Sequence, residues 1–409
     1  MDFYKIKFSL FLNYFVFAIL LNSVGVVILQ VQQNFGVGKT EASVLEAFKD
    51  LPIAVCSFVC ASFLPRLGIK NAMMLALSLV TVICVVVPFV PSFLSFKLLF
   101  CVVGISFALM KISVFTTIGL LTSSDKQHAS LMGYLEGCFM VGVLLGNLLF
   151  SFFIIDDNPA STQWLFVYWI IAGLSSLSLL FLLISKVDEN KVKHSSKSIV
   201  DDIKASARLF KNKNVYLFLS AAFLFVLIEQ SFQTWTPTFY NQNLKVPTSM
   251  SVQAGAILAG CFALGRFISG YFSRNFYWFS IVAICIIGFA ISLFLVLPLS
   301  NQHADSSSTW WKAPLVVYLF PLMGIFLAPI YPLLNSVILS TLPNYLHSSM
   351  AGLIVVFSAI GGTFGSIVTG YLFEHLDGKI AFYFSLVPLT LLLVCAAVLS
   401  KNNKSGSHE

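Results

Sequence analysis

Four ionisable residues stand inside long apolar stretches of the sequence: Lys111, Glu136, Glu229 and Arg266. A charge at the centre of a lipid bilayer costs about 2.5–3.5 kcal/mol on insertion scales, so these side chains are expected to pair or to face water. Burial disfavours the charged form of a carboxyl group, whereas an adjacent cation favours it. A carboxyl group between these influences can take up and release a proton, and Glu136 is the first candidate.

Three further charged residues, Glu46, Lys49 and Asp50, follow helical spacing. Residues three and four positions apart share one helix face, so the three side chains are expected to lie together. We predict proton-coupling roles for Glu46 and Asp50, and also for Glu229. The alternative for this group is an ion network in an outer vestibule.

Lys111 and Glu136 are predicted to pair, because they stand at similar depths in consecutive helices that a short loop joins. Lys111 would also suit an anionic group of a bound solute. The alternative is a buried pair that only fixes helix register. Polar or aromatic residues of other apolar stretches complete the predicted substrate-binding set, which is Lys111, Asn22, Gln230, Gln233, Trp235 and Asn335.

The composition is that of a membrane protein, with 58% hydrophobic and 10% charged residues against about 25% charged in average soluble domains. All eight cysteines lie in apolar stretches, where they are expected to be small buried hydrophobic residues. The net charge of +7 comes mostly from loops. We find no nucleophile–base arrangement, metal cluster, phosphate-cradling loop or nucleic-acid motif, so no enzyme activity, metal, cofactor or nucleic-acid partner is predicted.

Many apolar stretches are long enough to cross a bilayer, which takes about 20 residues as a helix. Six stretches, a polar loop and six more stretches predict an N-terminal six-helix bundle at 1–185, a cytoplasmic linker with an amphipathic helix at 186–214, and a C-terminal six-helix bundle at 215–409. The predicted spans are 8–31, 44–64, 71–91, 95–121, 129–155, 164–185, 215–240, 249–272, 276–299, 313–341, 347–373 and 380–400. Prolines in the tenth span, Pro321, Pro329 and Pro332, predict a bent or broken helix.

Basic residues predict the orientation of the chain in the membrane. With the N-terminus inside, sixteen Lys and Arg residues lie on the cytoplasmic side and five on the other. Both termini and the central loop are therefore expected in the cytoplasm. The first apolar stretch has no small-residue cleavage site after it, so we interpret it as a retained span and not a signal peptide.

An internal repeat divides the chain into two related halves. At an offset of 219 residues the fifth and eleventh spans align their histidines and glycines, which indicates a doubled fold. The aligned pairs are His128 with His347, Gly133 with Gly352, Gly142 with Gly361, and Gly146 with Gly365.

Six spans, a basic loop and six more spans with this repeat resemble the major facilitator superfamily. The loop ASFLPRLGIK, residues 61–70, is similar to the signature of that family between spans two and three. Arg66, Gly68 and Lys70 stand at matching positions, whereas Pro65 replaces the usual acid. The segment GRFISG, residues 265–270, is similar to the corresponding region of the second half. The resemblance implies an all-α membrane protein with 12 transmembrane helices in two pseudo-symmetric six-helix bundles, and gating roles for Arg66, Gly68, Lys70 and Arg266.

The seventh span resembles fucose–proton symporter-like bacterial carriers through Glu229, Trp235 and Pro237. The first span lacks the acid of those carriers, so the sugar is not carried over. The fifth span also lacks the Gly-Pro pair of many exporters of the family, which favours uptake.

Together these observations predict a monomeric secondary active transporter of the inner (plasma) membrane. It would import a small polar or anionic solute by alternating access, coupled to protons, with the lipid bilayer as its surroundings. Two alternatives stay open, which are a proton-driven exporter or drug antiporter of the same fold and a membrane sensor that has lost transport. The residues do not identify the substrate, and they leave open whether sodium replaces the proton.

Overall fold

The computed structural model describes the backbone of residues 2–121, 125–185, 209, 212–273, 275–301, 309–342 and 347–405. Within these ranges the secondary structure is helical throughout, and no strand occurs. Side chains are described for fewer residues, and those of Arg66 and Glu136 lie outside that set. The amphipathic helix predicted in the central linker also lies outside the described residues.

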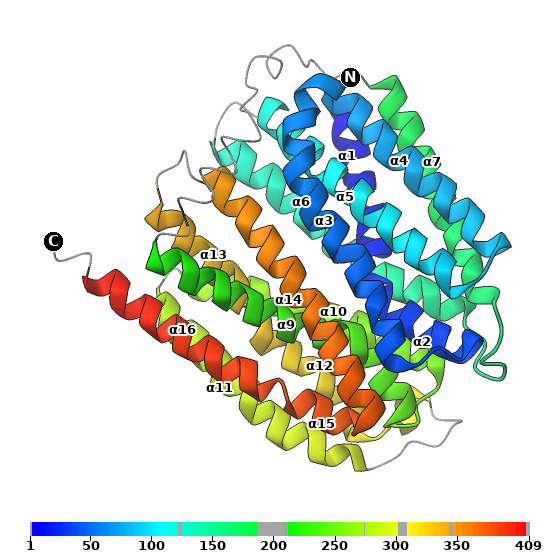
Figure 1. Cartoon of the computed structure of the whole chain (residues 1–409), viewed down its shortest axis with the longest axis vertical. Helices are drawn as coiled ribbons and strands as arrows, with labels where there is room; N and C mark the ends of the chain where they lie inside the picture. The colour runs from blue at the N-terminus through cyan, green and yellow to red at the C-terminus, as the bar shows by residue number, and fades with distance from the viewer. Residues whose placement is uncertain are drawn as a thin grey trace.

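The N-terminal half consists of long helices that run back and forth along one axis (Figure 1). They are α1 (Asp2–Asn22), α2 (Val24–Phe35), α3 (Lys39–Leu67), α4 (Ile69–Val86), α5 (Phe93–Leu121), α6 (Asp125–Phe153) and α7 (Phe166–Ile184), with short 3₁₀ helices at Val87–Phe89 and Gln163–Leu165.

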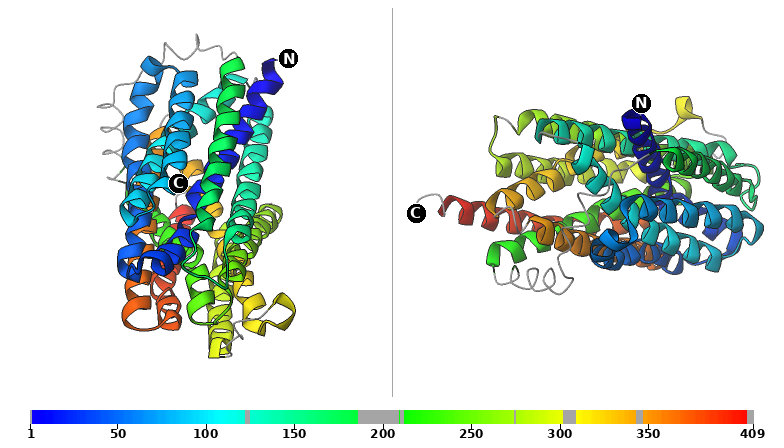
Figure 2. Two further views of the ribbon diagram at one scale, coloured as in Figure 1. Left: turned by 90° about the vertical axis from the view of Figure 1, so that its right-hand side faces the viewer. Right: turned by 90° about the horizontal axis from the view of Figure 1, so that it is seen from above.

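The C-terminal half repeats this arrangement. Its helices are α9 (Lys213–Gln242), α10 (Thr248–Phe272), α11 (Trp278–Val296), α12 (Leu315–Leu327), α13 (Ile330–Thr341), α14 (His347–His375), α15 (Gly378–Tyr383) and α16 (Leu386–Ser405), with 3₁₀ helices at Leu297–Asn301 and Trp310–Lys312. The side and top views show long, roughly parallel rods (Figure 2).

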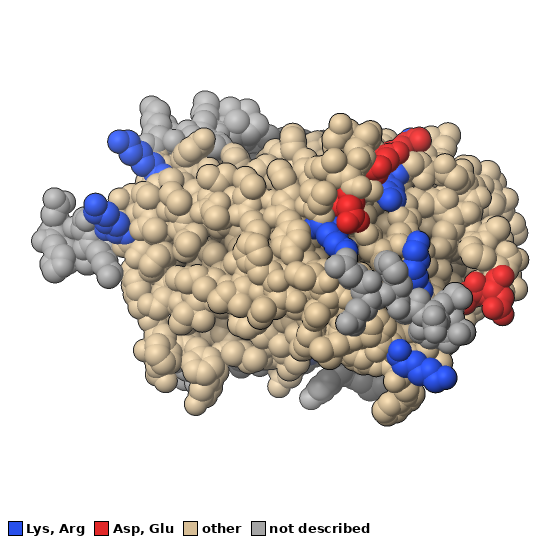
Figure 3. Space-filling view, turned by 90° about the horizontal axis from the view of Figure 1, so that it is seen from below, with Lys and Arg blue, Asp and Glu red and all other residues tan. Residues whose placement is uncertain are grey.

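Nine helical segments among the described residues are long and apolar enough to cross a membrane, and α1 with α2 gives a tenth if the bent pair is one span. α3 and α6 are each 29 residues long, so they also have the length of a crossing. The arrangement is therefore consistent with twelve spans. Charged side chains are sparse between broad uncharged areas on the face of the molecule that Figure 3 shows.

The first span is not the single helix over 8–31 that the sequence predicts. α1 and α2 meet at Ser23 with a bend of 43°. Ser23 turns its hydroxyl back to the carbonyl oxygen of Leu20 at 2.8 Å, and a side chain that bonds its own backbone in this way competes with the helix. Gly25, just after the break, lets α2 approach α9: a Cβ atom there would lie 2.5 Å from the carbonyl oxygen of Thr234.

The tenth predicted span also divides, into α12 and α13, at Ala328 and Pro329. Proline cannot donate the helical hydrogen bond and its ring crowds the preceding turn. The predicted break therefore occurs at Pro329, whereas Pro321 lies inside α12.

The internal repeat is confirmed by matching helix contacts. Gly142 of α6 lies against the backbone of Phe15 on α1, and Gly146 against Ile19. In the second half, Gly361 of α14 lies against Phe223 on α9, and Gly365 against Leu227. Small residues let helix backbones approach closely in a membrane, which explains why glycine stands at both aligned pairs.

Replacing Gly365 by alanine is expected to destabilise the fold by about 1–3 kcal/mol, the usual cost of overpacking. A Cβ atom at this position would overlap the carbonyl group of Leu227, whose carbon would be only 2.9 Å away. Thermal unfolding of the purified protein measures the loss. Gly173→Ala on α7 is the matched control, because nothing lies within 4 Å of its added Cβ; equal melting temperatures for the two variants would contradict the prediction.

The two halves meet through α3 against α14, α6 against α10, and α2 against α9. We call this interface the seam. We call the end of the bundle where α1 begins and α16 ends the terminal end, and the opposite end the distal end. α3 and α14 lie together at the distal end and diverge toward the terminal end (Figure 1).

Among the described residues, hydrogen bonds between the halves gather at the distal end. Lys39 donates to the carbonyl oxygen of Phe373 at 3.0 Å, and Glu374 accepts from the backbone nitrogen of Thr40 at 2.7 Å. A third bond joins the loop after α6 to the start of α10, where Asp156 accepts from the backbone nitrogen of Ser249 at 2.8 Å. The structure is thus a conformation whose halves are joined at the distal end and separate toward the terminal end.

Candidate functional site

A buried charged triad, Glu46, Lys49 and Asp50, lies on one face of α3. The Lys49 ammonium group contacts a carboxylate oxygen of Glu46 and lies 3.5 Å from Asp50 Oδ1. The side chains are 0%, 7% and 13% exposed for Glu46, Lys49 and Asp50. Charges buried to this degree need close partners, and the triad leaves one carboxylate in excess over its single cation.

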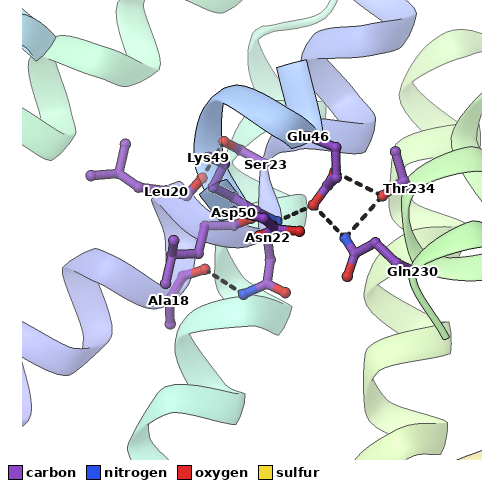
Figure 4. A network of polar contacts seen from close by, with 10 residues as sticks. Ala18, Leu20, Asn22, Ser23, Glu46, Lys49, Asp50, Gln230 and Thr234 are labelled. Atoms are coloured by element: carbon purple, nitrogen blue, oxygen red, sulfur yellow. Dashed lines mark hydrogen bonds and ion pairs between the residues drawn. The ribbon is translucent and has the colours of Figure 1, made fainter. Parts of the chain in front are cut away.

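Glu46 also binds the other half of the molecule (Figure 4). Gln230 Nε2 on α9 donates to Glu46 Oε1 at 2.7 Å, and Thr234 Oγ1, one turn later, donates to Glu46 Oε2 at 3.1 Å. Gln230 and Thr234 also bond one another at 3.0 Å. Both oxygens of one buried carboxylate therefore accept hydrogen bonds across the seam between the halves.

Two further elements, α1 and α14, surround the triad. Lys49 Nζ lies 3.4 Å from the carbonyl oxygen of Leu21 at the end of α1, next to the break at Ser23. Asp50 faces Gly362 of α14, where a Cβ atom would lie 2.8 Å from Asp50 Oδ2. The predicted clustering of the three charged residues is therefore present, but at the seam of the halves and not in an exposed vestibule.

A second ion pair lies within the C-terminal half. Arg266 of α10 lies 3.3 Å from Glu229 Oε1 of α9, and Gln233 Nε2 donates to the same oxygen at 3.2 Å. Glu229 is 12% exposed, whereas Arg266 is 33% exposed. Glu229, predicted for proton coupling, and Arg266, predicted for gating, thus form one ion pair.

A small cavity of about 30 Å³ lies between the two halves, and its wall includes Gln233, which donates to Glu229. Its walls come from both halves and combine three amide side chains with small and apolar residues. The lining residues are Asn22, Gly25, Val26, Val143, Asn147, Gln233, Pro237, Gly255, Leu258 and Ala259.

Comparison with known proteins identifies the family to which this fold belongs. The sequence profile described as Major Facilitator Superfamily matches residues 10–362 and 280–409. The chain belongs to the major facilitator superfamily. The protein is therefore a multi-pass membrane protein of a transporter family, and its buried ion pairs belong to a carrier fold.

One curated relative is the Saccharomyces cerevisiae protein named Bypass of stop codon protein 6, which is 25% identical over 340 residues. The alignment covers 76% of this chain and 66% of that relative, so it leaves about a third of the relative unmatched.

Solved structures of transporters share the fold. The D-xylose–proton symporter superposes with a TM-score of 0.76 at 12% identity, covering 98% of this chain and 97% of the other. The nucleoside transporter NupG gives 0.71 at 15% identity, covering 98% of each chain. FucP in its outward conformation gives 0.64 at 13% identity, covering 98% of this chain and 99% of FucP.

The superfamily signature loop is only partly described. Gly68 joins α3 to α4 with a φ of 86°, a conformation that favours glycine. Lys70 donates to the carbonyl oxygens of Leu183 and Ser185 at 2.9 and 2.8 Å, which lie at the end of α7 in the same half. A cation at a helix C-terminus is favourable, so Lys70 has a local structural role in this conformation, and its gating role stays a prediction.

The predicted solute-binding residues fall in several places in this major facilitator fold. Asn22 and Gln233 line the seam cavity, and Gln230 binds Glu46. Lys111 lies 5.8 Å from the ring centres of Phe107 and of Phe115 on α5. Its predicted pair with Glu136 involves a side chain outside the described residues.

Trp235 and Asn335 lie apart from the seam cavity. Trp235 is fully buried and donates to the carbonyl oxygen of Ser366 on α14 at 3.1 Å, so in this conformation it has no face toward a solute. Asn335 lies on α13, one turn after Tyr331. Its side-chain oxygen is buried without a hydrogen-bond partner in the described part of the chain.

The sequence reasoning missed Thr234 and Asn147. Thr234 stands four residues after Gln230 and therefore on the same face of α9, a signal that was available. Asn147 follows Gly146 of the repeat directly. Both are polar residues in apolar helices, but the residues that they face across the seam, Glu46 for Thr234 and Gly255 for Asn147, come from distant parts of the chain.

Proposed function

We propose that this chain is a proton-coupled secondary transporter that imports a small polar solute by alternating access. The observation that carries the proposal is the pair of hydrogen bonds from Gln230 and Thr234 to the buried carboxylate of Glu46. They make one titratable group of the N-terminal half a direct link to the C-terminal half.

The ionised and protonated forms of Glu46 differ in how they hold α9. An ionised carboxylate accepts hydrogen bonds at both oxygens, whereas a protonated one carries a donor on one of them. Protonation also removes the negative charge that faces Lys49. The protonated form therefore weakens the contact between the halves and favours separation at the distal end.

This difference couples proton movement to transport. A carrier that opens at its distal end when protonated takes up a proton there together with its solute. After the halves close at that end, loss of the proton at the terminal end restores the contact between Glu46 and α9. Asp50 and Glu229 are the other proposed proton-coupling residues in the described part of the chain, and Glu136 with Lys111 remains a proposal.

The charge distribution supports an orientation with the distal end outside and both termini in the cytoplasm of a cell whose inner (plasma) membrane holds the protein. The structurally similar proteins are named as transporters of D-xylose, of fucose and of nucleosides. These names favour uptake of a small polar solute.

Flux into proteoliposomes tests the proposal. With an acidic exterior, we expect accumulation of at least one of radiolabelled D-xylose, L-fucose and uridine above its external concentration, and collapse of the gradient with a protonophore. Uptake only with an acidic interior would indicate the exporter alternative. Binding without flux under any gradient would indicate the sensor alternative, and dependence on a sodium gradient would replace the proton.

A further inference from the structure

The seam cavity is lined by three amide side chains, and the nitrogen atom of each already donates one hydrogen bond. Asn22 Nδ2 donates to the carbonyl oxygen of Ala18 at 2.9 Å. Asn147 Nδ2 donates to the carbonyl oxygen of Val143 at 3.2 Å. Gln233 Nε2 donates to Glu229 Oε1 at 3.2 Å.

These bonds fix which way each amide points. A carbonyl or carboxylate oxygen only accepts hydrogen bonds, so turning any of these amides over would set two oxygens against each other. The side-chain oxygens of Asn22, Asn147 and Gln233 are therefore directed away from those partners. In the part of the chain that the structure describes, no donor bonds to any of the three oxygens.

The rest of the cavity wall offers no competing chemistry. Besides the three amides it consists of glycine, alanine, proline and aliphatic residues, and no charged side chain is among them. Gly255 of α10 faces Asn147, since a Cβ atom there would lie 3.5 Å from Asn147 Oδ1. The wall therefore presents three amide oxygens from α1, α6 and α9, together with the second N–H group of each amide, and no counter-charge.

This arrangement selects the chemical class of its occupant. A carboxylate or a phosphate would be buried without a cation in the cavity wall, which is costly. An ammonium group would be buried without a paired carboxylate, which is costly, because Glu229 is already paired with Arg266. An uncharged hydroxyl group donates to such oxygens at no such cost.

We propose that the seam cavity is a recognition subsite for hydroxyl groups of an uncharged solute, positioned by Asn22, Asn147 and Gln233. At about 30 Å³ the cavity holds one or two groups the size of a water molecule, so it receives one end of the solute. The remainder lies toward the terminal end, where the halves diverge. The subsite rests on the proposed transporter function only in that its occupant is the transported solute.

Occupation of the subsite also joins the two halves. Asn22 and Asn147 belong to the N-terminal half, and Gln233 belongs to the C-terminal half. A hydroxyl-bearing group that donates to oxygens of both halves stabilises the conformation closed at the distal end. The solute therefore acts on the same seam as Glu46 but through different atoms.

Binding to the purified full-length chain tests the subsite independently of flux. The probes are D-xylose, L-fucose, D-glucose and uridine, with D-glucuronate as the carboxylate counterpart of glucose and D-glucosamine as the ammonium counterpart. A ligand of the folded state raises the melting temperature. We expect a rise with at least one uncharged probe and none with glucuronate or glucosamine at the same concentration.

Two variants locate the effect. Asn147→Leu and Gln233→Leu are each expected to weaken binding of the effective probe about tenfold, the equivalent of one lost hydrogen bond. Asn71→Leu is the matched control: its amide bonds the carbonyl oxygen of Leu67 one turn back in the same way, but on the exposed face of α4.

Several results would overturn the subsite. A larger rise in melting temperature with glucuronate than with glucose would contradict the expected charge preference. An unchanged melting temperature with every uncharged probe would indicate that the cavity binds only water. Unchanged affinity in both leucine variants would place the solute elsewhere, even if proton-driven flux is intact. Conversely, selective binding without flux would uphold the subsite and refute the transport function.

Discussion

Glu46→Gln is expected to abolish accumulation of solute driven by a proton gradient, with at least a tenfold lower accumulation ratio, while exchange of solute across the membrane continues. The glutamine keeps the shape of the side chain and one acceptor for Gln230 or Thr234, but it cannot gain or lose a proton. The carrier then moves solute only down its own gradient. Proteoliposome uptake with and without a pH gradient, beside solute exchange at equal pH, measures both activities.

The matched control is Glu41→Gln on the same helix. Its carboxylate is 60% exposed and lies 4.0 Å from Lys97, so the change leaves the seam untouched and accumulation should equal that of the unaltered protein. Full concentrative uptake by Glu46→Gln would remove this residue from the coupling mechanism. Loss of exchange as well as accumulation would show instead that the variant cannot change conformation.

Lys49→Met should have the largest effect on stability, about 3–5 kcal/mol, which is the usual cost of removing one partner from a buried ion pair. The Glu46 and Asp50 carboxylates would then face one another in the seam without a cation. Thermal unfolding of the purified variant in detergent gives the size of the loss.

The double variant Glu46→Gln/Lys49→Met distinguishes an electrostatic loss from a packing defect. It returns the triad to one net negative charge, so we expect it to be more stable than Lys49→Met alone. Lys97→Met serves as the surface control, because its pair with the exposed Glu41 should be worth about 0–1 kcal/mol. The electrostatic explanation would be contradicted if the double variant were as unstable as Lys49→Met, or if Lys97→Met lowered the stability by as much as Lys49→Met.

The fold was predictable because membrane helices follow simple rules. Length and hydropathy locate the spans, and the glycines at 142, 146, 361 and 365 show the duplication, since close backbone approach admits little else. The break at Ser23 was not predictable in the same way. A serine in an apolar helix has no fixed consequence, and the approach of α9 to Gly25 comes from a residue more than 200 positions away.

The candidate site was predictable in its parts but not in its assembly. Helical spacing brought Glu46, Lys49 and Asp50 to one face, because that depends only on local geometry. The contact of Glu46 with Gln230 and Thr234 depends on how the two halves meet, which no local pattern encodes. For the same reason Glu229 and Arg266 were assigned to different tasks, although they form one ion pair.

Lys49 contacts the carbonyl oxygen of Leu21 as well as the carboxylates of Glu46 and Asp50. The last turn of α1 ends within the bundle, and carbonyl groups there lack helical partners. Lys49 thus contacts both a backbone helix end and two acids, so in the proposed mechanism a change in the protonation of either acid would leave this helix end with its partner. We therefore propose that Lys49 is the stationary charge around which the carboxyl groups change state, and that its contact with Leu21 keeps the first span tethered to α3 during the proposed cycle.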